Sequence, residues 1–246
     1  MTVAHCGTVS ALTLGLPAST AIPEAKGNLP KAMFVGRAAM SAKLGKQLKN
    51  DITGITMLAI TRPTNTTLAA GAKIPEILVI GLHLAPKVTT VPTEAIELIA
   101  AQRKSGIVFA VVRDMPFEGT TREECTLAVR RALPGRAGHT PVHQVFAGEW
   151  RPAGEAILDT DEVPEGGSLD DLWESICAQI ILGSSNGVDL DARITRRSQI
   201  RQLEATVDKL VRDHQRAKDA DQRNEIYAQL HKAKQQLDAL VAQATE

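Results

Sequence analysis

The last quarter of the chain constrains its fold most, because residues 189–244 contain no glycine and no proline. Apolar residues recur there every three or four positions, which places them along one face of an α-helix. The first such seam is Ile200, Leu203, Val207 and Leu210, and the second is Ile226, Leu230, Ala233, Leu237 and Leu240. The polar segment 218–225 separates them. The pattern predicts an antiparallel, coiled-coil-like helical hairpin.

Narrow apolar seams of this kind need another helix to cover them. We therefore predict that the hairpin contacts a protein partner or a second copy of the chain. The predicted contact residues are Ile200, Leu203, Val207, Leu210, Ile226, Leu230, Leu237 and Leu240. The alternative, that the two seams simply cover each other, stays open.

The overall composition excludes several classes of protein. The chain has 246 residues, with 28 Lys and Arg against 28 Asp and Glu, so its overall field steers neither nucleic acid nor membrane strongly. Cys6, Cys125 and Cys177 are too few and too scattered for a disulfide framework, which predicts a reduced, cytoplasmic setting. Residues 9–16 lack the cationic start of a secretory signal, and no run reaches the ~20 apolar residues that span a bilayer.

Charge is balanced overall but is distributed unevenly along the chain. Residues 25–50 contain six basic and no acidic side chains, whereas residues 149–174 contain nine acidic side chains and one arginine. The basic segment predicts a phosphate-binding strip for nucleic acid, with Arg37, Lys43, Lys46 and Lys49 as its contacts. A solvated helix surface is the alternative explanation.

Hydrophobic periodicity divides the chain into an extended arm (1–37) with one short strand, a core (38–182), a linker (183–187) and the hairpin (188–246). Within the core it predicts helices over 38–50, 93–104 and 169–182, and strands over 52–61, 76–84, 107–113, 125–132 and 142–150. Segment 125–132 also fits a short helix, but a strand paired with 107–113 is favoured. Thr93 and Ser168 are the expected helix caps. The order predicts an α+β fold, with a mixed or antiparallel sheet covered by helices.

No motif in the sequence predicts catalysis. It has no phosphate-binding glycine loop, nucleophile elbow or zinc motif. His139 and His143 fall in a predicted loop, and His5 and Cys6 lie near an end expected to be mobile. His83 is predicted to be a hydrogen-bonded histidine of the core or sheet edge, and Cys125 and Cys177 to be buried thiols. We therefore predict no catalytic residue, no cofactor and no metal ion.

A metal-dependent nuclease is considered because Asp51 and Glu76 flank two predicted strands and could supply carboxylates to a divalent ion. The strand after Glu76, residues 77–84, contains neither a second acid nor a lysine. The sequence therefore supports at most a degenerate nuclease-like domain.

Several segments resemble a bacterial family catalogued as domain of unknown function 4391. They are residues 14–20, 29–34, 48–52, 55–58, 76–77, 200–203 and 222–225. The resemblance implies a locus of restriction-like phage defence, with a helicase or DNA methyltransferase as partner. Relatives carry Glu and Lys in the second strand where this chain has Gly81, His83 and Ala85, which weakens the nuclease interpretation further.

These observations favour a non-catalytic accessory or adaptor protein that uses its helical hairpin for protein contact. The alternatives are a nucleic-acid-binding component that uses the basic helix near residues 37–49, and the degenerate nuclease-like domain.

Overall fold

The computed structural model describes residues 2–35, 41–133, 141–160, 163 and 166–245. The chain divides into two compact units, Met1–Val188 and Asp189–Glu246. None of the helices within these ranges is long and apolar enough to cross a membrane.

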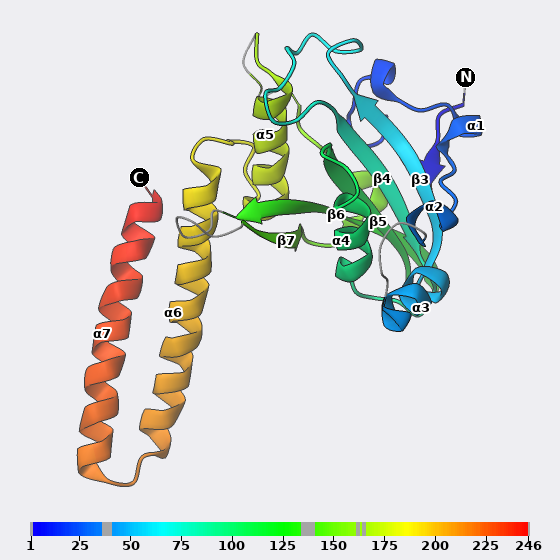
Figure 1. Cartoon of the computed structure of the whole chain (residues 1–246). Coiled ribbons are helices and arrows are strands. Elements are labelled where there is room, and N and C mark those ends of the chain that lie inside the picture. The colour runs from blue at the N-terminus through cyan, green and yellow to red at the C-terminus, as the bar shows by residue number, and fades with distance from the viewer. Residues whose placement is uncertain (1, 36–40, 134–140, 161–162, 164–165, 246) are drawn as a thin grey trace. The chain divides into compact units, whose positions relative to one another are not determined.

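A mixed β-sheet forms the centre of the first unit (Figure 1). Its spatial order is β3 (Ile52–Thr61), β4 (Ile77–Leu84), β5 (Gly106–Phe117), β6 (Thr120–Leu133) and β7 (Val142–Ala147), with β8 (Arg151–Pro152) also paired to β6. β4 and β5 are parallel, and the other neighbours are antiparallel. The α+β prediction is confirmed, and segment 125–132 is a strand paired with β5, as favoured.

One face of the sheet is covered by α3 (Ala42–Asn50) and by α4 (Thr93–Ala100), which connects the parallel strands β4 and β5. Leu48, Leu82, Ile96 and Phe109 are among the side chains buried between them. The predicted capping role of Thr93 is wrong, because Pro92 occupies the N-cap position and no side chain caps the helix. α4 also ends at Ala100, four residues earlier than predicted.

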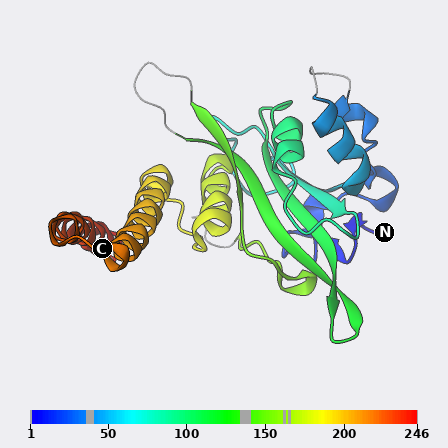
Figure 2. The ribbon, with the colours of Figure 1, turned by 90° about the horizontal axis from the view of Figure 1, so that it is seen from below.

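α5 (Leu169–Leu182) covers the opposite face of the sheet (Figure 2). Arg130 of β6 bonds to Glu97 of α4, whereas its neighbour Arg131 bonds to Glu174 of α5. Adjacent residues on a strand point to opposite faces, so the two helices must lie on different sides. Ser168 caps α5 as predicted, in a reciprocal capping box with Asp171.

The N-terminal segment contains β1 (His5–Cys6), β2 (Val9–Ser10), η1 (Ala18–Thr20), α1 (Glu24–Gly27) and α2 (Ala32–Val35). A further short helix, η2 (Ala153–Glu155), follows β8. Cys6 and Val9 are buried, and a Cβ on Gly81 of β4 would lie 2.4 Å from the Cβ of Cys6. The expectation of a mobile end at His5 and Cys6 is therefore wrong, because this hairpin packs on the same sheet face as α5.

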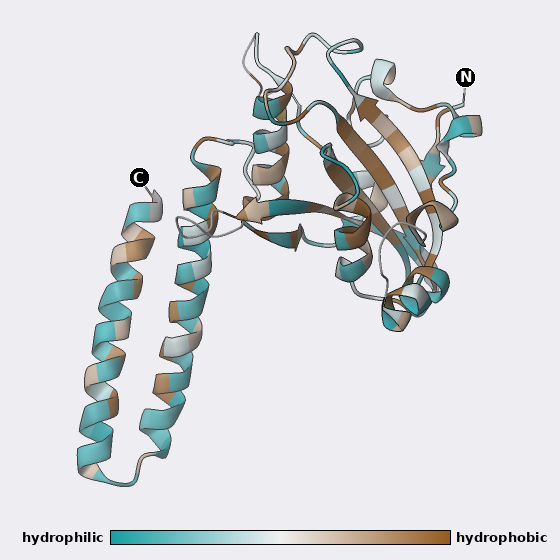
Figure 3. Cartoon of the chain, in the orientation of Figure 1, coloured by the Kyte–Doolittle hydropathy of each residue, from teal (hydrophilic) through white to brown (hydrophobic). Residues whose placement is uncertain are grey.

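The second unit is the predicted hairpin of α6 (Leu190–Arg216) and α7 (Ala220–Thr245). The break between the helices is shorter than the polar segment 218–225, because α7 already begins at Ala220. All eight predicted contact residues are half-buried and Ala233 is buried, while most flanking positions are exposed. Brown apolar positions alternate with teal polar ones along both helices (Figure 3). The two seams therefore cover each other in large part.

Candidate metal centre

Two acidic side chains stand directly opposite each other on β5 and β6. The antiparallel register pairs Asp114 with Glu123. Both point to the α5 face, because the adjacent residues Arg113 and Glu124 point to the α4 face, as does Ala128 farther along β6. Like charges in a directly opposed cross-strand pair destabilise a sheet. A positive charge between the two carboxylates would remove this repulsion.

His83 joins the two carboxylates from the neighbouring strand. The parallel register pairs His83 of β4 with Val112 of β5, so its ring lies on the same face as Asp114. Its Nε2 is 3.6 Å from Asp114 Oδ2, which is too far for a hydrogen bond. This nitrogen is shielded from solvent and has no hydrogen-bond partner among the described residues. The prediction that His83 is hydrogen-bonded is therefore wrong for its Nε2 atom.

His83, Asp114 and Glu123 each offer one ligand atom, and these three atoms lie within 4.8 Å of one another. Two atoms bound to one ion at about 2.1 Å lie at most about 4.2 Å apart, so small side-chain movements would complete a site. One imidazole and two carboxylates suit Zn²⁺, Mn²⁺ or Fe²⁺. We name this group the His83 cluster.

The N-terminal hairpin positions Glu123. The backbone N–H of Thr8 donates to Glu123 Oε2 over 2.7 Å, and the Thr8 hydroxyl donates to the same oxygen. Gly7, with φ +58°, lies so close that a Cβ there would sit 2.2 Å from Glu123 Oε1. Hydrogen bonds that orient a ligating carboxylate from outside are a regular part of metal sites.

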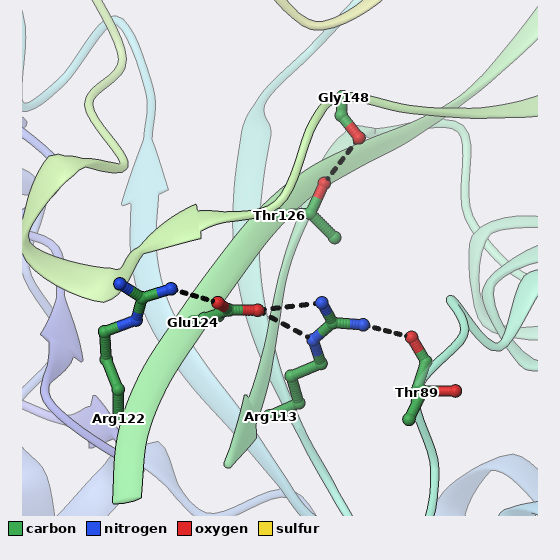
Figure 4. Close-up of polar contacts among 6 residues, drawn as sticks. All are labelled: Thr89, Arg113, Arg122, Glu124, Thr126 and Gly148. Carbon is green, nitrogen blue, oxygen red and sulfur yellow. Dashed lines mark hydrogen bonds and ion pairs between the residues drawn. The ribbon is translucent and has the colours of Figure 1, made fainter. Parts of the chain in front are cut away.

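A second polar network, on the α4 face, holds the same two strands in register (Figure 4). Glu124 accepts hydrogen bonds from Arg113 Nε at 3.1 Å, from Arg113 Nη2 at 2.7 Å and from Arg122 Nη2 at 2.7 Å. The guanidinium of Arg113 also stacks 3.8 Å from the ring of Trp150 and donates to the carbonyl of Thr89. Hydrogen bonds from Arg113 and then from Arg122 lower the pKa of Glu124.

Cys6 and Cys125 are buried on the same sheet face. Burial raises the pKa of each thiol to about 12, so both are neutral at physiological pH. The predicted buried thiols at Cys125 and Cys177 are confirmed.

The two acids proposed for a nuclease site are not brought together. Asp51 precedes the end of β3 where Ile52 pairs with Leu84, and Glu76 precedes the end of β4 where Ile77 pairs with Thr61. At a rise of ~3.3 Å per residue these points are more than about 20 Å apart. The Glu76 carboxylate also forms an ion pair with Arg62 Nη2 at 2.6 Å and accepts a hydrogen bond from the Ser105 hydroxyl at 2.9 Å. The structure thus gives no support to a metal site at either acid.

The structure describes three of the four residues predicted to form the basic strip. Arg37 lies outside the described residues. Lys43 donates to Glu94 over 2.8 Å, a hydrogen bond that raises the pKa of Lys43 and offsets its charge. Lys46 and Lys49 are exposed on α3. Of the two loop histidines, His143 is exposed on β7, and His139 lies outside the described residues.

Sequence reasoning missed the His83 cluster because it ended the strand at Arg113. A usable sequence signal was the Glu118-Gly119 pair, because a glycine favours a tight two-residue turn between strands. In the structure the φ angles of these residues are +47° and +77°. A two-residue turn of this kind fixes the register of both strands and hence pairs Asp114 with Glu123.

The fold is an α+β unit whose sheet carries the His83 cluster on one face, and a helical hairpin forms the second unit. The chain belongs to the family described as "Domain of unknown function (DUF4391)", whose model matches residues 14–237. The predicted family resemblance is thereby confirmed. No curated protein and no solved structure matched the chain.

Proposed function

We propose that the first unit binds one divalent transition-metal ion through His83, Asp114 and Glu123. The observation that carries this proposal is the opposed pair of carboxylates next to a solvent-shielded imidazole nitrogen that has no hydrogen-bond partner in the described part of the chain. A cation between them would remove the repulsion of the two acids and satisfy Nε2. Without the cation, the repulsion between the carboxylates and the unpaired Nε2 atom each cost free energy in the folded state.

The bound ion would retain positions for further ligands. Three protein ligands leave a four- to six-coordinate ion open to water or to an oxygen of another molecule. The Asp114 side chain is 37% exposed, so such a molecule can approach from solvent. An ion in this setting polarises a bound phosphate, carbonyl or water.

Titration calorimetry on the full chain, stripped with EDTA, tests metal binding. We expect one Zn²⁺ or Mn²⁺ per chain, and at least about a tenfold weaker affinity in His83→Ala and in Asp114→Asn. His143→Ala is the matched control, because His143 is exposed on β7 away from the cluster. Circular dichroism verifies that each variant is folded. Wild-type protein that binds no ion, or binding unchanged in the His83→Ala/Asp114→Asn double variant, would refute the proposal.

A hydrolysis assay separates a binding centre from a reactive one. DNA and RNA are incubated with the metal-loaded chain and with His83→Ala. Cleavage that is lost in the variant would assign phosphodiester hydrolysis to the His83 cluster. If cleavage is absent while calorimetry shows binding, metal binding is the function of the site.

The second candidate function is that of a cytoplasmic adaptor in a restriction-like or phage-defence system. The observation that favours it is the separate compact unit Asp189–Glu246, whose helices are mostly polar outside the seams. The partner would be a helicase or DNA methyltransferase from the same locus, as the family resemblance implies. Three free cysteines support the reducing compartment.

The variant that tests the adaptor role must lie outside the two apolar seams, because the seams cover each other. Leu203→Asp would open the hairpin itself, so lost capture by that variant would not locate a docking surface. Tyr227 of α7 is 59% exposed and is the better probe. We expect Tyr227→Glu to abolish capture of the co-encoded methyltransferase or helicase while helicity is unchanged, with Ser198→Glu on α6 as the exposed control. Capture that is absent in the wild type, or unchanged in Tyr227→Glu, would count against this role.

A further inference from the structure

A cavity of about 450 Å³ lies in the first unit, between the N-terminal segment, the connection from β3 to β4, and α5. Ile77 and Val79 of β4 and Leu172 and Ile176 of α5 form apolar walls. Threonine and asparagine side chains from residues 61–67 contribute most of the polar lining, and Ser19, Thr20 and Thr160 add to it. Ligand pockets in proteins have this size and this mixture of apolar walls with a few polar groups.

The cavity is separate from the His83 cluster. Ile77 and Val79 alternate with the residues of β4 that contact α4, so they share the sheet face of His83. Val79 lies four residues before His83 and Ile77 lies six before it, which is about 13 and 20 Å along the strand. A ligand in the cavity therefore does not contact the proposed metal ligands directly.

Among the residues that the structure describes, the lining contains no charged side chain. Transfer of a charged group into such a site, without an opposite charge, costs several kcal/mol. The lining thus discriminates against carboxylates, phosphates and amines, and favours uncharged molecules.

Thr61 provides the most constrained polar group. It is 5% exposed, it lines the cavity, and its hydroxyl has no hydrogen-bond partner among the described residues. By contrast, Thr20 and Thr66 in the same lining bond to the carbonyls of Pro17 and Arg62, at 2.7 Å and 2.9 Å. The Thr61 hydroxyl is therefore available to donate a hydrogen bond to a ligand in the cavity, or to accept one from it.

Hydrogen bonds between α5 and the connection from β3 to β4 hold two sides of the cavity in place. The carboxylate of Asp170, at the start of α5, accepts hydrogen bonds from the backbone N–H groups of Ala72, Lys73 and Ile74, at 2.8, 3.0 and 2.8 Å. The N–H of Leu169 also donates to the carbonyl of Ala69 over 3.0 Å. These bonds fix the β3–β4 connection against α5, so the cavity is formed before any ligand arrives.

We infer that this cavity is a second binding site, for an uncharged small molecule with an apolar body and a hydrogen-bonding group that reaches Thr61. The class includes neutral amides and alcohols of metabolite size. The inference does not depend on the proposed metal site.

Methyl NMR on the full chain, with labelled Ile, Leu and Val, tests the inference. The probes are matched sets of aromatic amides, carboxylates and amines that share one ring system. We expect the amides to shift the methyl signals of Ile77, Val79, Leu172 and Ile176, with affinities at least about tenfold better than those of their charged counterparts. Thr61→Val, which removes only the hydroxyl, should weaken amide binding severalfold.

Ile176→Phe fills the cavity and should abolish the amide-induced shifts, whereas Val142→Phe on exposed β7 should leave them unchanged. Thermal unfolding verifies that both variants are folded. If Ile176→Phe does not fold, Val79→Leu serves as a milder filling variant. Equal binding of charged and neutral probes, absence of shifts at these methyls, or unchanged binding in a folded filled variant would overturn the inference.

Discussion

Arg113 of β5 donates two hydrogen bonds, from Nε and Nη2, to Oε2 of Glu124 on β6. These two residues are the neighbours in sequence of Asp114 and Glu123, the opposed acids of the His83 cluster. The pair therefore fixes the register that places the two acids of the His83 cluster opposite each other. The Arg113 side chain is 14% exposed and that of Glu124 is 12% exposed, so this ion pair is largely removed from solvent.

Glu124→Gln should lower the free energy of unfolding at pH 7 by about 1 to 3 kcal/mol, because two arginines lose their carboxylate. The folded-state pKa of Glu124 is lowered, so its contribution to stability is fully present above the ordinary carboxyl pKa. That contribution is lost as the pH falls through the lowered pKa. Urea denaturation between pH 7 and pH 3 should show the two proteins converging at the acid end.

Glu118→Gln is the matched control for this series, because Glu118 is exposed in the turn between β5 and β6. A difference from wild type that is independent of pH, or an equal loss in the control, would contradict the assigned role of Glu124.

Gly81→Ala should destabilise the first unit by about 1 to 3 kcal/mol, as overpacking of a tight core does. The added methyl would lie 2.4 Å from Cys6 Cβ and 3.0 Å from its Sγ. Gly54→Ala on β3 is the control, since nothing lies within 4 Å of a Cβ there. In a double-mutant cycle measured by urea denaturation, Cys6→Gly should recover part of the loss, and strict additivity would disprove the contact.

Ser168→Ala should cost roughly 1 kcal/mol, the usual value of an N-cap hydroxyl. Ser168 also donates backbone and side-chain hydrogen bonds to Asp171, and these lower the pKa of that carboxyl. Because the folded-state pKa is lowered, this stabilisation is present above the ordinary Asp pKa and declines as the pH falls through the lowered value. Thermal unfolding at pH 7 measures the loss. Ser198→Ala, at an exposed position within α6, should change the midpoint far less.

All three cysteines should resist a thiol reagent in the native protein. Cys6, Cys125 and Cys177 are at most 3% exposed, and burial raises the pKa of Cys6 and of Cys125 to about 12. Dithionitrobenzoate at pH 8 should modify them slowly and in proportion to unfolding, with three equivalents released in denaturant. Rapid labelling of even one thiol in the folded state would show that this side of the sheet is open.

Local signals accounted for elements whose pattern is complete within a short segment. The Ser168 cap, the strand Ile52–Thr61 and the bounds of α5 were all predicted correctly. The extension of β5 through Phe117 was missed, because the charged Arg113 and Asp114 end its apolar run and Pro116 is disfavoured inside a strand. Pairing with β6 holds those residues in the strand nevertheless, and no local pattern expresses that contact.

The sequence by itself determined the helical period of the C-terminal hairpin, the apolar strands, the cap of α5 and the burial of Cys125 and Cys177, because each depends on neighbours within one or two turns or on side-chain polarity. Only the tertiary structure decided that Asp51 and Glu76 stay apart, that Cys6 is covered, and that His83 meets Asp114 and Glu123. The physical reason is that strand order and register place side chains from distant segments on one sheet face. Those variables are set by the cooperative packing of the whole core.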